Sequence, residues 1–217
     1  PETTKFVQHW EVEGQGKKHL LVIVRNTRLT QLLHRMLCEQ EFLSDYGIRA
    51  MSKIYEQIPF VFSAQDRQYV VHYTPAESDS SMFGGNSNWR GPIWFPINFL
   101  IVESLQRFHY YYGGNIQIEF PTHSEEYFNL NEISEKLSQR LCSLFLKDGN
   151  GNRPFNGGVE KFNHDPYFKD LILFNEYFNG DTGKGLGASH QTGWTSTVTK
   201  MLQPRNLLST LNKEFLT

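Results

Sequence analysis

The residues best suited to catalysis lie in one run, LFNEYFNGDTGKGLGASHQTGW, from Leu173 to Trp194. Its carboxylate, Glu176, precedes a glycine-rich turn, and the turn leads into a Ser-His-Gln-Thr-Gly-Trp sequence typical of a helix start. A carboxylate at a helix end can accept a proton from water when neighbours such as Tyr177 and Asn179 orient it. The alternative interpretation is an ordinary solvated helix carboxylate.

The turn after Glu176 carries glycines that allow a ligand to approach the backbone closely. It also contains Lys184, as phosphate-binding loops do, but Gly185 stands where such a loop needs Ser or Thr. A nucleotide site is therefore disfavoured. His190 and Gln191 fall in the expected first helical turn, where free N–H groups favour oxygen ligands. A capping or core role for His190 is the alternative.

A second run, FGGNSNWRGPIW, combines glycine, amide side chains and tryptophan in the same way. Trp89 can stack on the apolar face of a sugar ring, and Arg90 can donate several hydrogen bonds to hydroxyl groups. Asn86 and Asn88 add further polar groups, whereas Trp94 is interpreted as a core residue. Together the two runs indicate a carbohydrate site.

Other chemistries lack their patterns. There is no Gly-x-Ser-x-Gly elbow, and Cys38 and Cys142 fall in amphipathic segments that favour buried thiols over a disulfide. No His-Glu-x-x-His spacing occurs, so we expect no metal and no cofactor. Glu77 and Asp79 are loop acids that either face the carbohydrate site or are solvated.

The composition narrows the possible partners. A net charge of -2 over 217 residues gives no reason to expect a nucleic acid. No apolar run approaches the ~18 residues of a membrane span, and no secretory signal precedes residue 20, so we expect a cytoplasmic protein without a membrane contact. Aromatic residues make up 14% of the chain, enough to serve a core or a stacking surface.

The elements that must position these residues are mostly helices. An irregular lead-in is expected over residues 1–18, and a strand pair is possible at 68–73. Pro92 is expected in the first turn of one helix, and Asn129 or Asn131 is expected to cap the next. Apolar residues at helical spacing predict helices over residues 29–41, 92–112, 129–148, 165–179 and 189–202, with a terminal helix at 204–217.

Three segments resemble the mannosyl-oligosaccharide glucosidase family, which is glycoside hydrolase family 63. They are EFLSDYGIRAMSK at 41–53, the stretch containing NSNWRGPIW at 73–108, and LFNEYFNGDTGKGLGASHQTGWTSTV at 173–198. The likeness covers nearly all of residues 20–202 and is greatest to the large bacterial members.

The resemblance implies a mainly α fold of the (α/α)6-barrel type, with this chain supplying roughly the C-terminal half of the helices, joined by long loops. It also implies an inverting mechanism on α-linked glucosides in which Glu176 is the general base. The residues expected to bind substrate are Arg49, Asn86, Asn88, Trp89, Arg90, Gly187, His190, Gln191 and Trp194.

The chain departs from the family pattern at the general acid. The family places this Asp on a loop far upstream, and nothing before Glu176 matches that motif. We therefore expect the acid on a missing upstream segment, and either that segment or self-association to cover the exposed helix faces. The expected partners are thus a small glycoside or oligosaccharide and the missing half of the barrel. A non-catalytic carbohydrate-binding or assembly module is the alternative.

Overall fold

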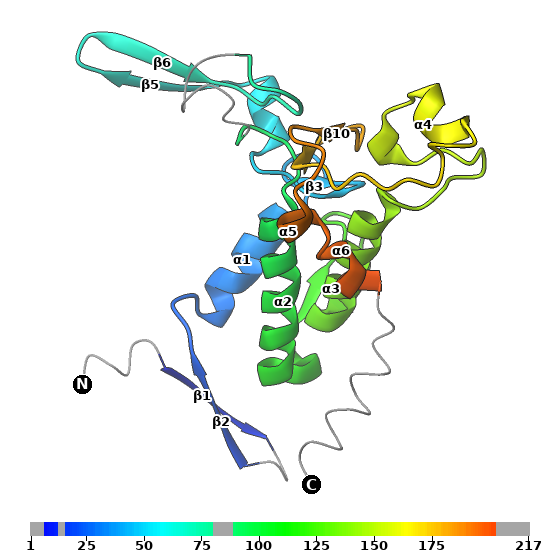
Figure 1. Cartoon of the computed structure of the whole chain (residues 1–217). Coiled ribbons are helices and arrows are strands. Elements are labelled where there is room, and N and C mark those ends of the chain that lie inside the picture. Colours follow the sequence, from blue (N-terminus) through cyan, green and yellow to red (C-terminus); the bar gives the residue numbers. More distant parts are fainter. Residues whose placement is uncertain (1–6, 13–15, 80–88, 203–217) are drawn as a thin grey trace, which may run out of the picture.

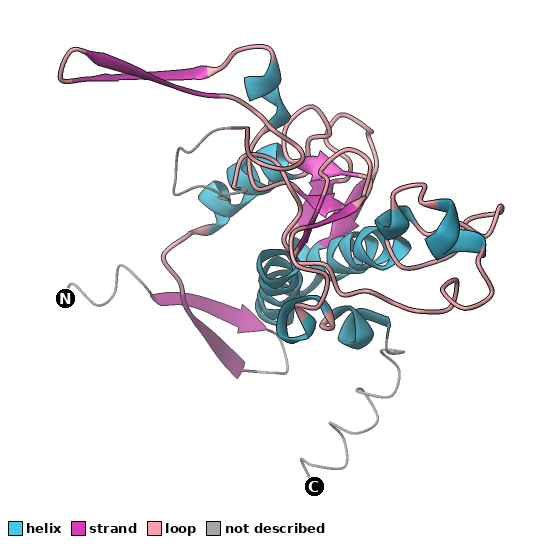
Figure 2. Cartoon of the chain, turned by 45° about the horizontal axis from the view of Figure 1, so that its top comes forward, coloured by secondary structure: helices cyan, strands magenta, loops and turns pink. Residues whose placement is uncertain are grey.

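The computed structural model describes residues 7–12, 16–79 and 89–202 of the 217-residue chain. Within them, helices alternate with short β-hairpins and long connecting loops (Figures 1 and 2). The α-helices are α1 (Asn26–Met36), α2 (Phe95–Tyr112), α3 (Leu130–Ser143), α4 (Glu160–His164), α5 (Thr192–Thr195) and α6 (Val198–Leu202). Short 3-10 helices occupy η2 (Lys53–Glu56), η3 (Gly113–Asn115) and η4 (Pro154–Asn156).

The strands form separate two-stranded antiparallel sheets, each between elements that follow one another in the chain. They are β1 (Val7–Val12) with β2 (Gly16–Leu21), β3 (Leu43–Ser44) with β4 (Gly47–Ile48), β5 (Phe60–Ala64) with β6 (Arg67–Val71), β7 (Gln117–Glu119) with β8 (Tyr127–Asn129), and β9 (Tyr177–Phe178) with β10 (Gly185–Leu186). The strand pair expected near residues 68–73 is therefore present as β5–β6, although it starts earlier.

This mixture contradicts the predicted mainly α, (α/α)6-barrel architecture. The helix expected over residues 165–179 is replaced by turns, extended chain and strand β9. Its apolar residues Leu171 and Ile172 are exposed to solvent, so no packed element stabilises a helix there. The helix expected over residues 189–202 is likewise reduced to α5 and α6, of four and five residues.

The core lies where α2 and α3 pack side by side, with α1 next to them (Figure 1). Fully buried side chains from α3, such as Ile133, Leu137 and Leu141, meet Val102 and Leu105 of α2. Asn98 of α2 is also buried. Its side-chain amide accepts the backbone N–H of Ile48 in β4 at 2.7 Å and donates to the carbonyl of Ile48 at 3.0 Å. This amide fixes the β3–β4 hairpin against the first turns of α2.

Two helix starts were predicted with different success. Asn129 caps α3 in a capping box with Glu132, which confirms the prediction from the pattern. By contrast α2 begins at Phe95, three residues after Pro92, so the predicted start was wrong. The backbone before Phe95 is held extended because Ile93 exchanges hydrogen bonds with Phe178 at 2.8 and 3.0 Å.

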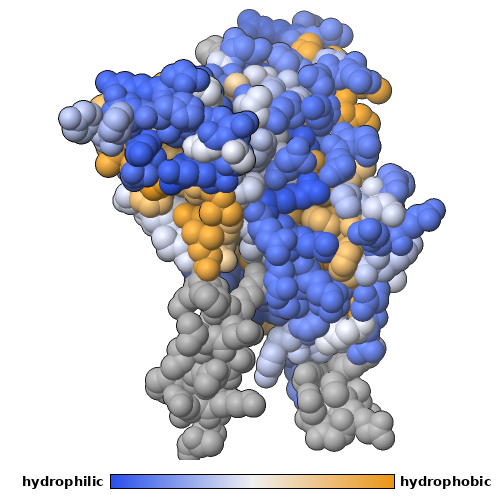
Figure 3. Space-filling view, turned by 90° about the vertical axis from the view of Figure 1, so that its right-hand side faces the viewer, coloured by the Kyte–Doolittle hydropathy of each residue, from blue (hydrophilic) through white to orange (hydrophobic). Residues whose placement is uncertain are grey.

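Apolar side chains are exposed on the described hairpins near the N-terminus and at β5–β6. The β1–β2 hairpin begins within the stretch expected to be an irregular lead-in, and the terminal helix expected at 204–217 lies outside the described residues. The β5–β6 hairpin projects from the body (Figure 1) with Phe60, Phe62 and Val70 about half exposed. Hydrophobic patches also interrupt the polar face drawn in Figure 3.

Among the described residues, no helix has the length and apolar character that a membrane span requires.

Candidate active site

The three segments that carry the family resemblance meet at one backbone ladder. Ile93 forms a β-bridge with Arg49 on one side and with Phe178 on the other. The chain also packs tightly here, because a Cβ on Gly180 would stand 2.5 Å from the carbonyl oxygen of Gly91. Residues that are far apart in the sequence, including Arg49, Trp94 and Glu176, are therefore brought to one region of the fold.

Glu176 lies at a bend just before β9, and its side chain is partly exposed. Its backbone N–H donates to the carbonyl of Ala188 at 2.8 Å, and its Oε2 accepts the Ala188 N–H at 3.1 Å. Tyr177 and Asn179, named above as neighbours that could orient this carboxylate, use their side chains in other hydrogen bonds. Tyr177 donates to Glu77, and the Asn179 side chain accepts N–H groups of its own turn.

Gly187 makes room for the carboxylate of Glu176. Its φ is +67°, and a Cβ there would stand 2.8 Å from Glu176 Oε2 and 2.6 Å from the ring of Tyr177. Only glycine meets both requirements without strain. The carboxylate of Glu176 and the ring of Tyr177 therefore both lie against Gly187.

An aromatic stack extends from that ring. Trp94 stacks on Tyr177 with centroids 4.9 Å apart, and Trp89 stacks on Trp94 at 4.6 Å with the rings 7° from parallel. Trp94 is 6% exposed, which agrees with its interpretation as a core residue, whereas Trp89 is 51% exposed. Trp194, 40% exposed, lies 5.8 Å from Trp94. The outer face of this stack is the type of surface on which a sugar ring packs.

Arg90 is buried, unlike its neighbour Trp89. Its Nη2 donates to Ser78 Oγ at 2.7 Å and to Asp79 Oδ1 at 2.8 Å. The hydrogen bond from His72, together with the nearby Arg90, lowers the pKa of Asp79 below its usual value. Asp79 is thus an ionised partner of Arg90. Asn86 and Asn88, expected beside Arg90, lie outside the described residues.

Arg49, which belongs to the ladder, and Asp181 form a polar cluster. Arg49 is 8% exposed; it donates to Asp181 Oδ1 at 3.1 Å, to the hydroxyl of Tyr73 at 3.1 Å, and to the carbonyl of Leu43. Lys53 and Tyr73 each reach the same Asp181 oxygen at 3.0 Å. Burial raises the pKa of Asp181, but the hydrogen bonds and positive charges outweigh it and the pKa is lowered overall.

His190 and Gln191 do not stand in a helical first turn. His190 is exposed and forms a parallel bridge with Phe174, and the N–H of Gln191 donates to the Phe174 carbonyl at 2.8 Å. Helix α5 begins only at Thr192. The N–H of Gln191 is therefore already engaged by the protein.

The sequence did not predict two sets of contacts near Glu176. Tyr177 donates to Glu77 at 2.6 Å, and Asp181 accepts hydrogen bonds from Arg49, Lys53 and Tyr73. These partners lie far apart in the sequence, and the only local signal was that Tyr177 and Asp181 follow Glu176 closely. Cys38 and Cys142 are buried and are not joined in a disulfide, as their amphipathic segments indicated.

Comparison with known proteins identifies the family of the chain. A family model described as the glycosyl hydrolase family 63 C-terminal domain matches residues 19–150, which include Arg49, Trp89 and Arg90 but not Glu176. An uncharacterized protein of Saccharomyces cerevisiae is 54% identical over 192 residues, covering 88% of this chain and 18% of that protein.

Two named glucosidases are more distant relatives. A probable mannosyl-oligosaccharide glucosidase of Schizosaccharomyces pombe is 25% identical, with 81% of this chain and 15% of the relative covered. The mannosyl-oligosaccharide glucosidase of Saccharomyces cerevisiae is 23% identical, with 93% and 18% covered. The chain therefore spans less than a fifth of the length of these relatives. From the match over residues 19–150, the chain belongs to glycosyl hydrolase family 63.

Proposed function

We propose that this chain is part of an inverting α-glucosidase in which Glu176 is the general base. The observation that carries the proposal is the setting of its carboxylate, which is partly exposed, fixed by the Ala188 N–H, and flanked by glycine and an aromatic ring. A base must be held in place yet reach a water molecule. Membership of the family and the two relatives named as glucosidases support the substrate class.

The aromatic stack supplies a surface for the sugar. The outer face of Trp89 is open, and Trp94 and Tyr177 support it from behind. A ring supported in this way loses little conformational freedom when a glucosyl unit packs on it. Trp194, His190, Gln191 and Gly187 complete the proposed lining. Arg90, which is buried and bound to Ser78 and Asp79, supports it from behind. Arg49, whose donors are engaged by protein groups, acts by holding this region together.

The general acid is proposed to come from outside this chain. An inverting enzyme needs a second carboxyl group about 6.5–9.5 Å from the base, and it must be protonated before bond cleavage. Asp79 is unsuited because its pKa is lowered by His72 and Arg90. Glu77 accepts the Tyr177 hydroxyl and serves better as a support for the aromatic stack.

The stereochemistry of the product tests this function. The full-length protein is incubated with α-glucosides whose leaving group is not glucose, such as a nitrophenyl α-glucoside, so that all the glucose released comes from the cleaved bond. The anomeric proton of this glucose is followed by NMR. Inversion predicts that the β-anomer appears first and the α-anomer follows by mutarotation. Initial release of the α-anomer, or no hydrolysis of any α-glucoside, contradicts the proposal.

A further inference from the structure

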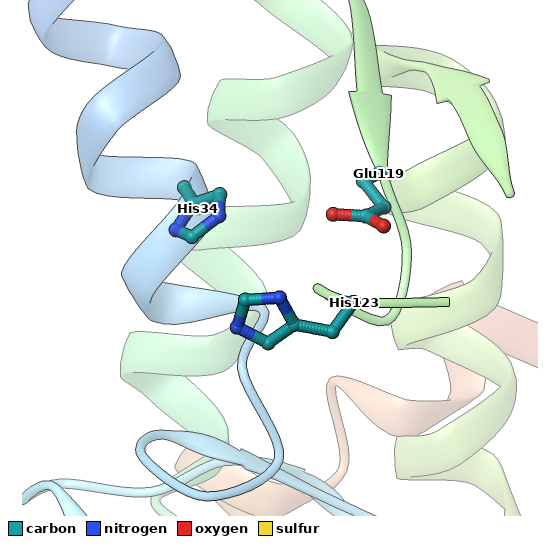
Figure 4. Close-up of side chains that lie close together, drawn as sticks. All are labelled: His34, Glu119 and His123. Carbon is teal, nitrogen blue, oxygen red and sulfur yellow. The ribbon is translucent and has the colours of Figure 1, made fainter. Parts of the chain in front are cut away.

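Three side chains with metal-binding atoms meet at the opposite end of α1 from the β1–β2 hairpin (Figure 4). His34 lies in the last turn of α1, Glu119 ends strand β7, and His123 lies in the loop between β7 and β8. One nitrogen or oxygen from each lies within 4.8 Å of the others. This cluster includes none of the residues proposed to bind or hydrolyse sugar.

The backbone holds the two histidines next to each other. Thr122, which precedes His123, donates its hydroxyl to the carbonyl of His34 at 2.7 Å and its N–H to the carbonyl of Leu37 at 3.0 Å. His123 itself has a φ of +75°, which is uncommon for a residue with a side chain. The loop is thus fixed to the helical turn that carries His34, and the imidazoles meet edge to face at 5.5 Å.

The third group is a carboxylate held by the backbone. The N–H of Glu125 donates to Glu119 Oε1 at 2.8 Å. Support of this kind is what orients carboxylate ligands in metal sites. The carboxylate of Glu119 faces the histidines (Figure 4).

We propose that His34, Glu119 and His123 bind one divalent transition-metal ion of the zinc class. Two imidazoles and one carboxylate suit zinc, whereas calcium and magnesium prefer oxygen ligands alone. Ligand atoms around a tetrahedral zinc ion stand roughly 3.4 Å apart, given bond lengths of about 2.1 Å. Both histidines are exposed, so their imidazoles have room to rotate toward a shared ion.

The ion would join α1 to the β7–β8 hairpin and leave a fourth position for water. Sequence spacing hid the site, because its ligands are spread from residue 34 to residue 123 and follow no short motif. This proposal departs from the expectation of no metal, which was drawn from the absence of a local sequence pattern.

Zinc titration of the full-length protein tests the site. Chelator-treated wild type and the His34→Ala/His123→Ala double variant are titrated with zinc alone by isothermal calorimetry. The wild type should bind one more equivalent than the double variant. Glu119→Gln should lower the zinc affinity of this site at least ~10-fold, since loss of even an outer-shell partner lowers metal affinity by about 10–100-fold.

A matched control and a stability measurement complete the test. His164, an exposed histidine 3.5 Å from Glu160, is replaced by alanine, and this variant should keep the wild-type stoichiometry. Zinc should raise the melting temperature of wild type and His164→Ala but not of the double variant, while all three melt alike in chelator. Equal zinc binding by wild type and double variant would overturn the proposal, as would equal zinc-induced stabilisation.

Discussion

Arg49 and Asp181, 132 residues apart, form an ion pair at 3.1 Å that joins the first and last of the family-like segments. Asp181 lies in the turn between β9 and β10, and Glu176 precedes β9. Lys53 and Tyr73 donate to the same carboxylate oxygen. This polar cluster therefore holds the hairpin that carries the proposed base.

Asp181→Asn should destabilise the full-length protein by about 1–3 kcal/mol, because it leaves the buried guanidinium of Arg49 without its anionic partner. Urea unfolding measures this difference. Asp170→Asn, which removes an exposed partner of Lys147, is the control and should change stability by less than about 0.5 kcal/mol. Equal effects of the two substitutions would show that the cluster does not stabilise the fold.

The contribution of Asp181 should also depend on pH. Its folded pKa lies below the unfolded value of about 3.9, so its stabilising effect is complete above roughly pH 5 and is lost as the pH falls. The difference in stability between wild type and Asp181→Asn should therefore shrink between about pH 5 and pH 3. A difference that grows on acidification would contradict the lowered pKa.

Trp89→Ala should weaken binding of an α-linked disaccharide by about 1–3 kcal/mol, because the stack loses its outer face. Since Trp89 is half exposed, the melting temperature should change little. Calorimetric titration reports the affinity, and Tyr167→Ala removes a more exposed aromatic residue as the control. Unchanged affinity with a large fall in melting temperature would make Trp89 a structural residue.

Gly187→Ala should lower turnover at least ~10-fold, because the new Cβ would press on Glu176 Oε2 at 2.8 Å and the φ of +67° disfavours alanine. Gly114→Ala adds a Cβ that meets nothing within 4 Å, so its turnover should match the wild type. Turnover and circular dichroism are measured for both. Full activity in Gly187→Ala would mean that the carboxylate does not need this space.

How far the sequence predicted the structure depended on the range of the interactions. The cap at Asn129 follows from residues three apart, and the sequence predicted it. The start of α2 depends on the pairing of Ile93 with Phe178, which no local pattern contains. The helix expected around Glu176 failed for the same reason, since tertiary pairing overrode helical spacing.

The site shows the same division. Glu176 and Trp89 stand out by residue type and by their glycine-rich neighbours, so the sequence was enough to single them out. The partners of Arg49 and Arg90 come from other segments, and only the folded chain shows that both guanidinium groups bind protein carboxylates. A resemblance between sequences does not reveal which arginines are already engaged.

The most direct test of the account is the turnover of Glu176→Gln in the full-length protein on its best α-glucoside. Glutamine keeps the shape of the side chain but accepts no proton, so turnover should fall by ~10²–10⁴ or more while the melting temperature stays near that of wild type. Glu160→Gln, at an exposed carboxylate on α4, should retain full turnover. Near wild-type turnover by Glu176→Gln would contradict its assignment as the general base.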